Sequence, residues 1–206
     1  MAKIKLTKNE LKRQRDALKR YTRYLPTLEL KKRQLLTEIR RIQDEITKLK
    51  NQYESMKKDV EKWIAVFSEK VDVSVLFSLK EIETEVGNIA GTDIPLFEGI
   101  TFEDVEYDLM KYPLWVDVGI ETAKTFIAMN AEIDILKKQE EIVQEELRTT
   151  VQRINLFDKI LIPQTQENIR KIRIFLGDQQ TASVVRGKIA KSKLEKKKME
   201  DVVKSF

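Results

Sequence analysis

Apolar residues recur along the first third of the chain in alternating steps of three and four. The stripe runs from Leu11 to Phe67, and only Gln14 and Lys32 interrupt it with polar side chains. A stripe two residues wide per heptad is the seam of a coiled coil, whereas a helix in a globular core has a wider apolar face. We therefore predict one long helix from about Thr7 to Lys70.

Two local signals refine this helix. Thr7 followed by Glu10 fits a capping box, in which the hydroxyl accepts a hydrogen bond from an otherwise unpaired backbone N–H. Pro26 lies inside the helical pattern, and an internal proline removes a backbone donor and clashes with the preceding turn. We therefore expect the helix to bend near Pro26.

The middle of the chain changes to a period of two, which is typical of a half-buried strand. Ile82, Thr84 and Val86 alternate with glutamates. The turn-forming residues that follow are Gly87, Gly91, Asp93, Pro95 and Gly99. We predict a β-hairpin with strands near 81–89 and 99–105. The run VDVSVLFS before it is compatible with a strand or a short helix, and the segment from Tyr112 to Trp115 is expected to be a connector.

The last third returns to helical periodicity, and we predict a helix from about Val118 to Met199. A second stripe runs from Phe126 to Leu161 in steps of three and four. After an extra step of four residues the pattern resumes at Ile169 and Ile172. Such a shift is typical of a stutter, which locally unwinds a supercoil. Because Pro163 falls at this shift, we expect a bend and a change of register at the same place.

These elements predict a mostly α fold, in which a long antiparallel two-helix coiled coil carries a short β-hairpin region between the helices. Each helix needs a partner for its seam, and the other helix is tethered beside it. The predicted segments are an N-terminal coiled-coil helix over 1–70, an acidic connector with the hairpin over 71–120, and a C-terminal coiled-coil helix with a basic tail over 121–206. The two termini are then expected at the same end.

Charge divides the chain in the same way. Residues 1–24 hold nine Lys and Arg against two acids, and residues 186–206 hold eight against three, whereas residues 71–120 hold eleven acids against two Lys. Charge runs often do no more than keep helix faces solvated. If the termini meet, however, they make a basic end opposite an acidic one, and the two ends are expected to contact different surfaces.

Composition removes several classes of function. The chain has no Cys and no His, so thiolate chemistry, His-based catalysis and the usual zinc sites are excluded. No glycine-rich phosphate loop occurs, and the Lys and Arg clusters lack the interleaved aromatics of most nucleic-acid binders. No apolar run is long enough to span a membrane, and the N-terminus lacks an apolar signal core. We expect no enzymatic activity, no cofactor, no nucleic acid, no direct membrane insertion and a cytoplasmic location.

Three stretches together resemble the D subunit of the V-type and archaeal A-type rotary ATPases, the central rotor shaft of those complexes. LTKNELKRQRDALKR at 6–20 is similar to that family's basic, leucine-spaced opening helix, and NIAGTDIP at 88–95 is similar to its hairpin turn. RINLFDKILIPQTQENIRKIRIFL at 153–176 resembles its most specific motif. The matching positions of these last two motifs are Asn88, Gly91 and Pro95, then Arg153, Asn155, Asp158, Ile162, Pro163, Ile169, Ile172, Arg173 and Leu176.

The resemblance implies a non-catalytic shaft that carries torque between an ATP-hydrolysing or ATP-synthesising ring and an ion-translocating membrane rotor. The implied partners are the nucleotide-binding A and B subunits, the small F subunit of the central stalk and the C/d subunit that serves as the membrane-rotor adaptor. The location is then peripheral to the membrane. From the basic end we expect contacts toward the ring. The candidate residues are Arg13, Arg15, Lys19, Arg186, Lys188 and Lys191.

The chain departs from the family pattern at Pro26, and at Gly177 with the QQTAS run that follows. A prefoldin-like chaperone, also two long helices around β-hairpin structure, and a plain coiled-coil scaffold remain the alternative functions. A chaperone is expected to be shorter and to carry apolar tips, whereas the tips of this chain are highly charged.

Overall fold

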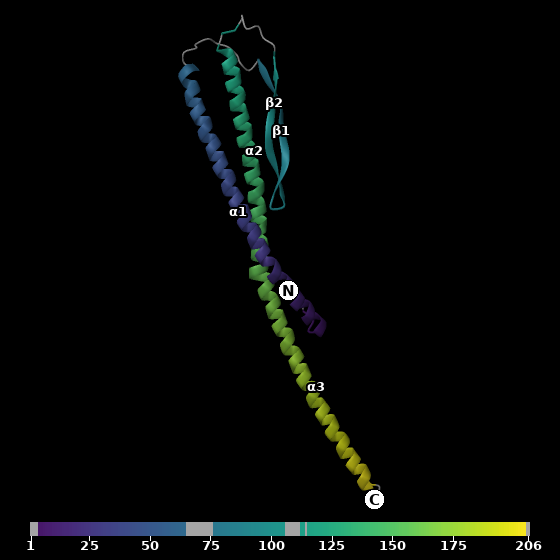
Figure 1. The fold of residues 1–206 in the computed structure, drawn as a ribbon. Helices are drawn as coiled ribbons and strands as arrows, with labels where there is room; N and C mark the ends of the chain where they lie inside the picture. Colours follow the sequence, from purple (N-terminus) through teal and green to yellow (C-terminus); the bar gives the residue numbers. More distant parts are fainter. Residues whose placement is uncertain (1–3, 65–75, 106–111, 114, 205–206) are drawn as a thin grey trace. The chain divides into compact units, whose positions relative to one another are not determined.

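The structure is a computed structural model that describes residues 4–64, 76–105, 112, 113 and 115–204. Its elements in chain order are α1 (Lys8–Ile64), β1 (Phe77–Ile89), β2 (Thr92–Asp104), α2 (Val116–Asn155), the π-helix η2 (Leu156–Leu161) and α3 (Ile162–Lys204), as Figure 1 shows. The predicted fold class is confirmed: long helices dominate, and the two strands form one antiparallel hairpin. The predicted residues 65–70 and most of VDVSVLFS lie outside the described residues.

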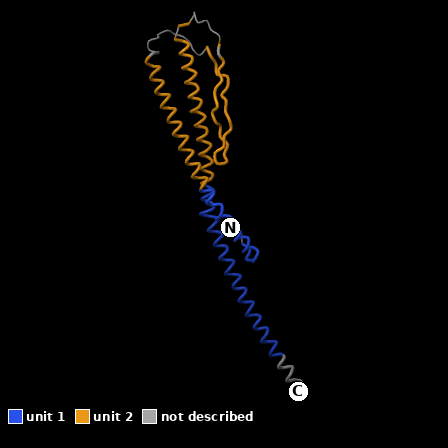
Figure 2. The backbone as a smooth tube through the Cα atoms, in the orientation of Figure 1, with its two compact units in different colours: residues 1–29, 152–206 blue, residues 30–151 orange. Residues whose placement is uncertain are grey.

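The chain forms two compact units. Unit 1 comprises residues 1–29 and 152–206, and unit 2 comprises residues 30–151 (Figure 2). Both basic terminal stretches therefore belong to unit 1, and the acidic middle of the chain belongs to unit 2. The three segments predicted from charge and periodicity stay a prediction.

Unit 2 is built around a core that α1, the hairpin and α2 share. Leu35 and Val143 are fully buried there, and Ile94 of β2 is 3% exposed. The ion pair of Lys31 with Glu146 and the edge-to-face contact of Tyr53 with Phe126 fix the direction of the helices. As residue numbers rise along α1 they fall along α2, so the two helices are antiparallel in this unit, and Figure 1 shows the hairpin beside them.

The predicted stripe of α1 coincides with its buried face. Every stripe position from Leu11 to Val60 is buried or half-buried, including the polar Gln14 and Lys32. The cause is the period: steps of three and four return the side chain to one side of a helix with 3.6 residues per turn. On α2 the face is wider, because Ile135 and Gln139, which lie off the stripe, are buried as well.

The hairpin differs from its prediction. The strands span 77–89 and 92–104, so the expected loop over 90–98 is wrong, and Pro95 and Gly99 lie within β2. A two-stranded sheet consists of edge strands only, and an edge strand tolerates proline because its N–H need not bond a neighbour. The register shifts once between Leu79 and Glu81 and once between Glu83 and Thr84, which marks a β-bulge at each place.

Unit 1 pairs the first part of α1 with η2 and α3. The Tyr21 and Phe157 rings are in tilted contact with their centroids 5.4 Å apart, and Asn168 Nδ2 lies 3.5 Å from Gln14 Oε1. The Thr7 half of the predicted capping box is confirmed, since the Glu10 N–H donates to Thr7 Oγ1 at 3.3 Å. The other half does not form, because the Thr7 N–H donates to the Lys5 carbonyl and not to the Glu10 side chain. α1 continues through Pro26 without interruption, and the bend expected there stays a prediction.

The π-helix η2 takes up the change of register that the sequence predicts near Pro163. The seam steps from Phe157 to Ile169 contain one residue more than alternating threes and fours allow. In η2 the Ile162 N–H donates to the Phe157 carbonyl, five residues earlier, and the widened turn accommodates the extra residue. Pro163, which cannot donate a backbone hydrogen bond, follows directly.

Beyond Leu176, α3 has no partner among the described residues. Every residue from 177 to 197 is exposed, including Val184, Val185, Ile189 and Leu194. Figure 2 shows this part of unit 1 continuing past the beginning of α1. A helix of this length is only marginally stable in water by itself. Its exposed apolar residues are available to another molecule.

Candidate interaction surfaces

No catalytic constellation is present among the described residues. In the part of the chain that the structure describes, no group of three or more carboxylates could hold a metal ion. The hydrogen bond and the negative charge of Asp59 raise the pKa of Lys62. That pair is fully exposed, so it has the character of a surface ion pair and not of an active site.

The hairpin turn is the first candidate, and it is held by its own side chains. Ala90 and Gly91 both have positive φ, at 51° and 81°, as a two-residue hairpin turn with the twist of the strands requires. Asn88 Oδ1 accepts the Gly91 N–H at 3.0 Å, and Asn88 Nδ2 donates to Asp93 at 2.7 Å. The structure thus brings together the first two of the predicted residues Asn88, Gly91 and Pro95 in one turn.

Replacing Gly91 with alanine is expected to lower the free energy of unfolding by about 1 kcal/mol, because its backbone is left-handed. A Cβ there would meet no neighbour, so the cost is conformational. Gly99→Ala is the matched control: its Cβ is equally free and its φ is not left-handed, so no loss is expected. Urea unfolding followed by tryptophan fluorescence measures both. Equal effects of the two changes would contradict the argument.

The hairpin is anchored to α2 near this turn. Gln139, which is 5% exposed, donates through Nε2 to the Pro95 carbonyl at 2.6 Å. Ile94 lies beside this bond in the core with Leu136. An unpaired carbonyl at this buried place would cost free energy. The hydrogen bond from the buried amide of Gln139 therefore holds the hairpin at one position on α2.

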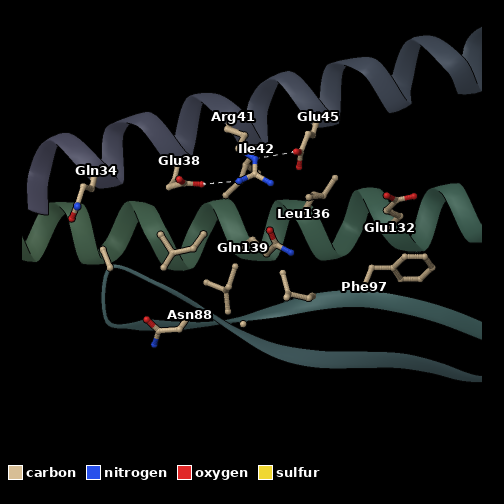
Figure 3. Close-up of a pocket in the computed structure, with 15 residues that line it drawn as sticks. Gln34, Glu38, Arg41, Ile42, Glu45, Asn88, Phe97, Glu132, Leu136 and Gln139 are labelled. Carbon is tan, nitrogen blue, oxygen red and sulfur yellow. Dashed lines mark hydrogen bonds and ion pairs between the residues drawn. The ribbon is translucent and has the colours of Figure 1, made fainter.

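A groove of about 630 Å³ follows the hairpin tip in unit 2. Figure 3 shows it between α1, α2 and the hairpin, with Arg41 between Glu38 and Glu45 on α1. The Arg41 guanidinium lies 3.7 Å from Glu38 and 3.2 Å from Glu45, so its charge is already neutralised. Glu132 and Phe97 also line the groove. Its rim is therefore acidic around a partly apolar floor.

A second groove, of about 860 Å³, lies between α1 and α3 in unit 1, and we call it the basic groove. Leu11 and Leu18 of α1 and Ile169 and Ile174 of α3 form its apolar part, and Asp16 is its one acid. Its cationic side chains, all of them exposed, are Lys8, Lys12, Arg15, Lys19, Arg170 and Arg173.

The basic residues predicted to contact a ring do not share one surface. Arg15 and Lys19 line the basic groove. Arg13 is 80% exposed outside it and lies 4.0 Å from Glu10. Arg186, Lys188 and Lys191 lie on the exposed part of α3.

The motif residues of the last third have two different situations. Ile169 and Ile172 are buried in the seam and Leu176 is half-buried, so these three have a structural role. Ile162 is half-buried, whereas Arg153, Asn155, Asp158, Pro163 and Arg173 are exposed. Arg173 lines the basic groove.

Sequence reasoning missed Gln139 and Arg170. Gln139 lies off the apolar stripe, and no local signal distinguishes a buried glutamine from an exposed one. Arg170 was detectable in principle, because Gln166, Arg170 and Arg173 are spaced to share one face of α3, but the partner face on α1 is about 150 residues away in sequence.

No helix in the described part of the chain is long and apolar enough to cross a membrane.

The comparisons agree with one another. The family model described as the ATP synthase D subunit matches residues 10–192. The V-type ATP synthase D subunit of Borreliella burgdorferi is 51% identical over 198 residues, covering 96% of this chain and 98% of the relative. The proteins of the same name from Chlamydia muridarum and Chlamydia abortus are 33% and 31% identical, each over at least 96% of both chains.

Proposed function

Because this chain belongs to the family of ATP synthase D subunits, we propose that it is the non-catalytic shaft of a V-type ATP synthase, a multi-subunit complex that couples ATP to ion transport. In this role it transmits torque between a ring of nucleotide-binding A and B subunits and the rotor in the membrane. The family membership carries the proposal.

The two units supply what such a shaft needs. In each unit α1 lies against the second helical segment along an apolar seam, and paired helices resist bending and twisting better than one helix. The exposed end of α3, with Arg186, Lys188 and Lys191, supplies a surface that the described residues leave uncovered. We propose that this end and the beginning of α1 lie inside the ring, with Arg13, Arg15 and Lys19 facing it.

Unit 2 is then the part toward the membrane rotor. We propose that the small F subunit binds near the hairpin, where the acidic groove around Arg41 and Glu132 lies. We propose that the C/d adaptor also binds unit 2. The shaft is peripheral to the membrane in this arrangement, because its contact with the membrane rotor is made through the adaptor.

A reversible cross-link tests whether the chain rotates. The chain has no cysteine, so Arg186→Cys introduces its single thiol at an exposed position. Paired with one cysteine on the inner face of the ring and oxidised, the complex is expected to lose both ATP hydrolysis and ATP-driven ion transport, because the ring can no longer turn around the shaft. Reduction is expected to restore both.

The complex with Arg186→Cys and no ring cysteine, treated with the same oxidant, is the control and is expected to keep its activity. A cross-linked complex that hydrolyses ATP and transports ions as fast as the uncross-linked complex would overturn the shaft function. It would favour a static scaffold, whose attachment to the ring does not matter for turnover.

A further inference from the structure

We propose that the basic groove between α1 and α3 binds an acidic amphipathic segment of a partner protein. The proposal rests on the proposed function, in which this end of the chain lies among other subunits, and it names the chemistry of the segment that meets it. One wall of the groove belongs to α1 and the other to α3, both within unit 1.

The cations of this groove are not ion-paired within the described part of the chain. Within the described residues, none of Lys8, Lys12, Arg15, Lys19, Arg170 and Arg173 forms an ion pair. Elsewhere on the same helices Arg13, Arg41 and Lys171 each lie within 4.0 Å of a carboxylate. Six like charges around one cavity, with Asp16 as the one acid, create a positive potential that a negatively charged partner relieves.

The apolar side chains of the groove restrict the class of partner. Ile174 is 55% exposed, and Leu11 and Leu18 are half-buried. An inorganic anion or a phosphate chain would leave these surfaces in water, whereas a peptide with both acidic and apolar residues covers them. No aromatic side chain lines the groove, so it lacks the stacking platform of single-stranded nucleic-acid sites.

The two walls are helices, and this sets the geometry of the occupant. Apolar residues of an incoming helix at i, i+3 or i+4 and i+7 fit the line from Leu11 to Leu18, and acids beside them reach the flanking Lys and Arg. Each exposed ion pair contributes only about 0.2–1 kcal/mol and weakens with salt. Binding is therefore expected to be modest and salt-sensitive, which suits a contact that forms and breaks during rotation.

A peptide binding experiment tests the groove in the full-length chain. The probe is a fluorescently labelled helical peptide of leucine and glutamate, with leucines on one face, and the readout is fluorescence anisotropy at low and high salt. The double variant Arg15→Glu/Arg170→Glu is expected to bind about tenfold more weakly, a loss of about 1.4 kcal/mol. Arg23→Glu/Lys159→Glu has the same change of charge in unit 1, outside the groove, and is expected to bind within about twofold of the unchanged chain.

The composition of the probe separates the possible occupants. A peptide with the same glutamates and serine in place of leucine is expected to bind more weakly, and equal binding would overturn the amphipathic part of the proposal. Polyphosphate is added at the same concentration of negative charge as the leucine–glutamate peptide. If it displaces the peptide completely, the ligand carries phosphate, and the proposal of a peptide ligand is overturned. Equal loss in both double variants would show a general charge effect and would overturn the groove.

The outcomes remain distinct from those of the cross-link experiment. If the peptide does not bind but the cross-link stops turnover, the groove proposal is rejected and the proposed shaft function stands. If the peptide binds in the groove but the cross-link has no effect on turnover, rotation is rejected and the groove is a static contact. All four replaced side chains are exposed, and circular dichroism is expected to show both variants folded.

Discussion

Replacing Leu35 with alanine is expected to lower the free energy of unfolding of unit 2 by about 3 kcal/mol. Leu35 is 0% exposed and belongs to the core that joins α1, the hairpin and α2. Removing a buried leucine side chain loses its transfer free energy and leaves a cavity, which together cost about 2–5 kcal/mol. Both tryptophans, Trp63 and Trp115, belong to unit 2, so their fluorescence in a urea titration follows this unit.

Leu30→Ala is the matched control for this prediction. Leu30 has the same side chain on the same helix and is 56% exposed, so its replacement is expected to change stability by less than about 0.5 kcal/mol. A similar loss for both variants would mean that helix propensity, and not the shared core, limits the stability of this part of α1. Leu35→Ala without a measurable loss would contradict the packing of α1 on α2 and the hairpin.

Deleting one residue from α3 is expected to destabilise unit 1 far more than deleting one from η2. Deletion of Glu167 turns all following residues by about 100° around the helix, which removes Ile169 and Ile172 from the seam. Burial of each contributes about 1.5–3 kcal/mol, so the expected loss is about 3–6 kcal/mol. Deletion of Asp158 instead removes the extra residue of the π-helix, and the seam after Pro163 is expected to stay in place.

Circular dichroism during urea unfolding compares the two deletions, which both remove one exposed acid. The expected result is a clear loss for the Glu167 deletion and little loss, or a gain, for the Asp158 deletion. If the Asp158 deletion is the more damaging, the π-helix does not absorb an extra residue and our explanation of η2 is wrong. If both are harmless, the seam of α3 contributes little to unit 1.

The long helices and their buried faces were predictable from periodicity. The stripe from Leu11 to Val60 coincides with buried and half-buried positions, and the cap at Thr7 forms as expected. Such features are local, because residues three and four apart on a helix share a face whatever the rest of the chain does. The change of register near Pro163 was visible for the same reason, although the sequence did not show that a π-helix accommodates it.

The hairpin shows where local reasoning stops. The glycines, Asp93 and Pro95 are typical of a loop, yet Pro95 and Gly99 lie in β2, and the turn consists of Ala90 and Gly91 alone. The strand continues through these residues because Ile94 is buried in the core and Gln139 of α2 holds the Pro95 carbonyl. Tertiary packing here outweighs the local preference of the residues.

The sequence by itself determined the helical class of this protein, the course of its seams and the family to which it is similar, because each depends on the order and spacing of neighbouring residues. The tertiary structure decided the extent of the hairpin, the role of Gln139 and the basic groove, which joins Lys8–Lys19 to Gln166–Ile174. Those features depend on contacts between residues far apart in the chain, and only folding brings such residues within reach of one another.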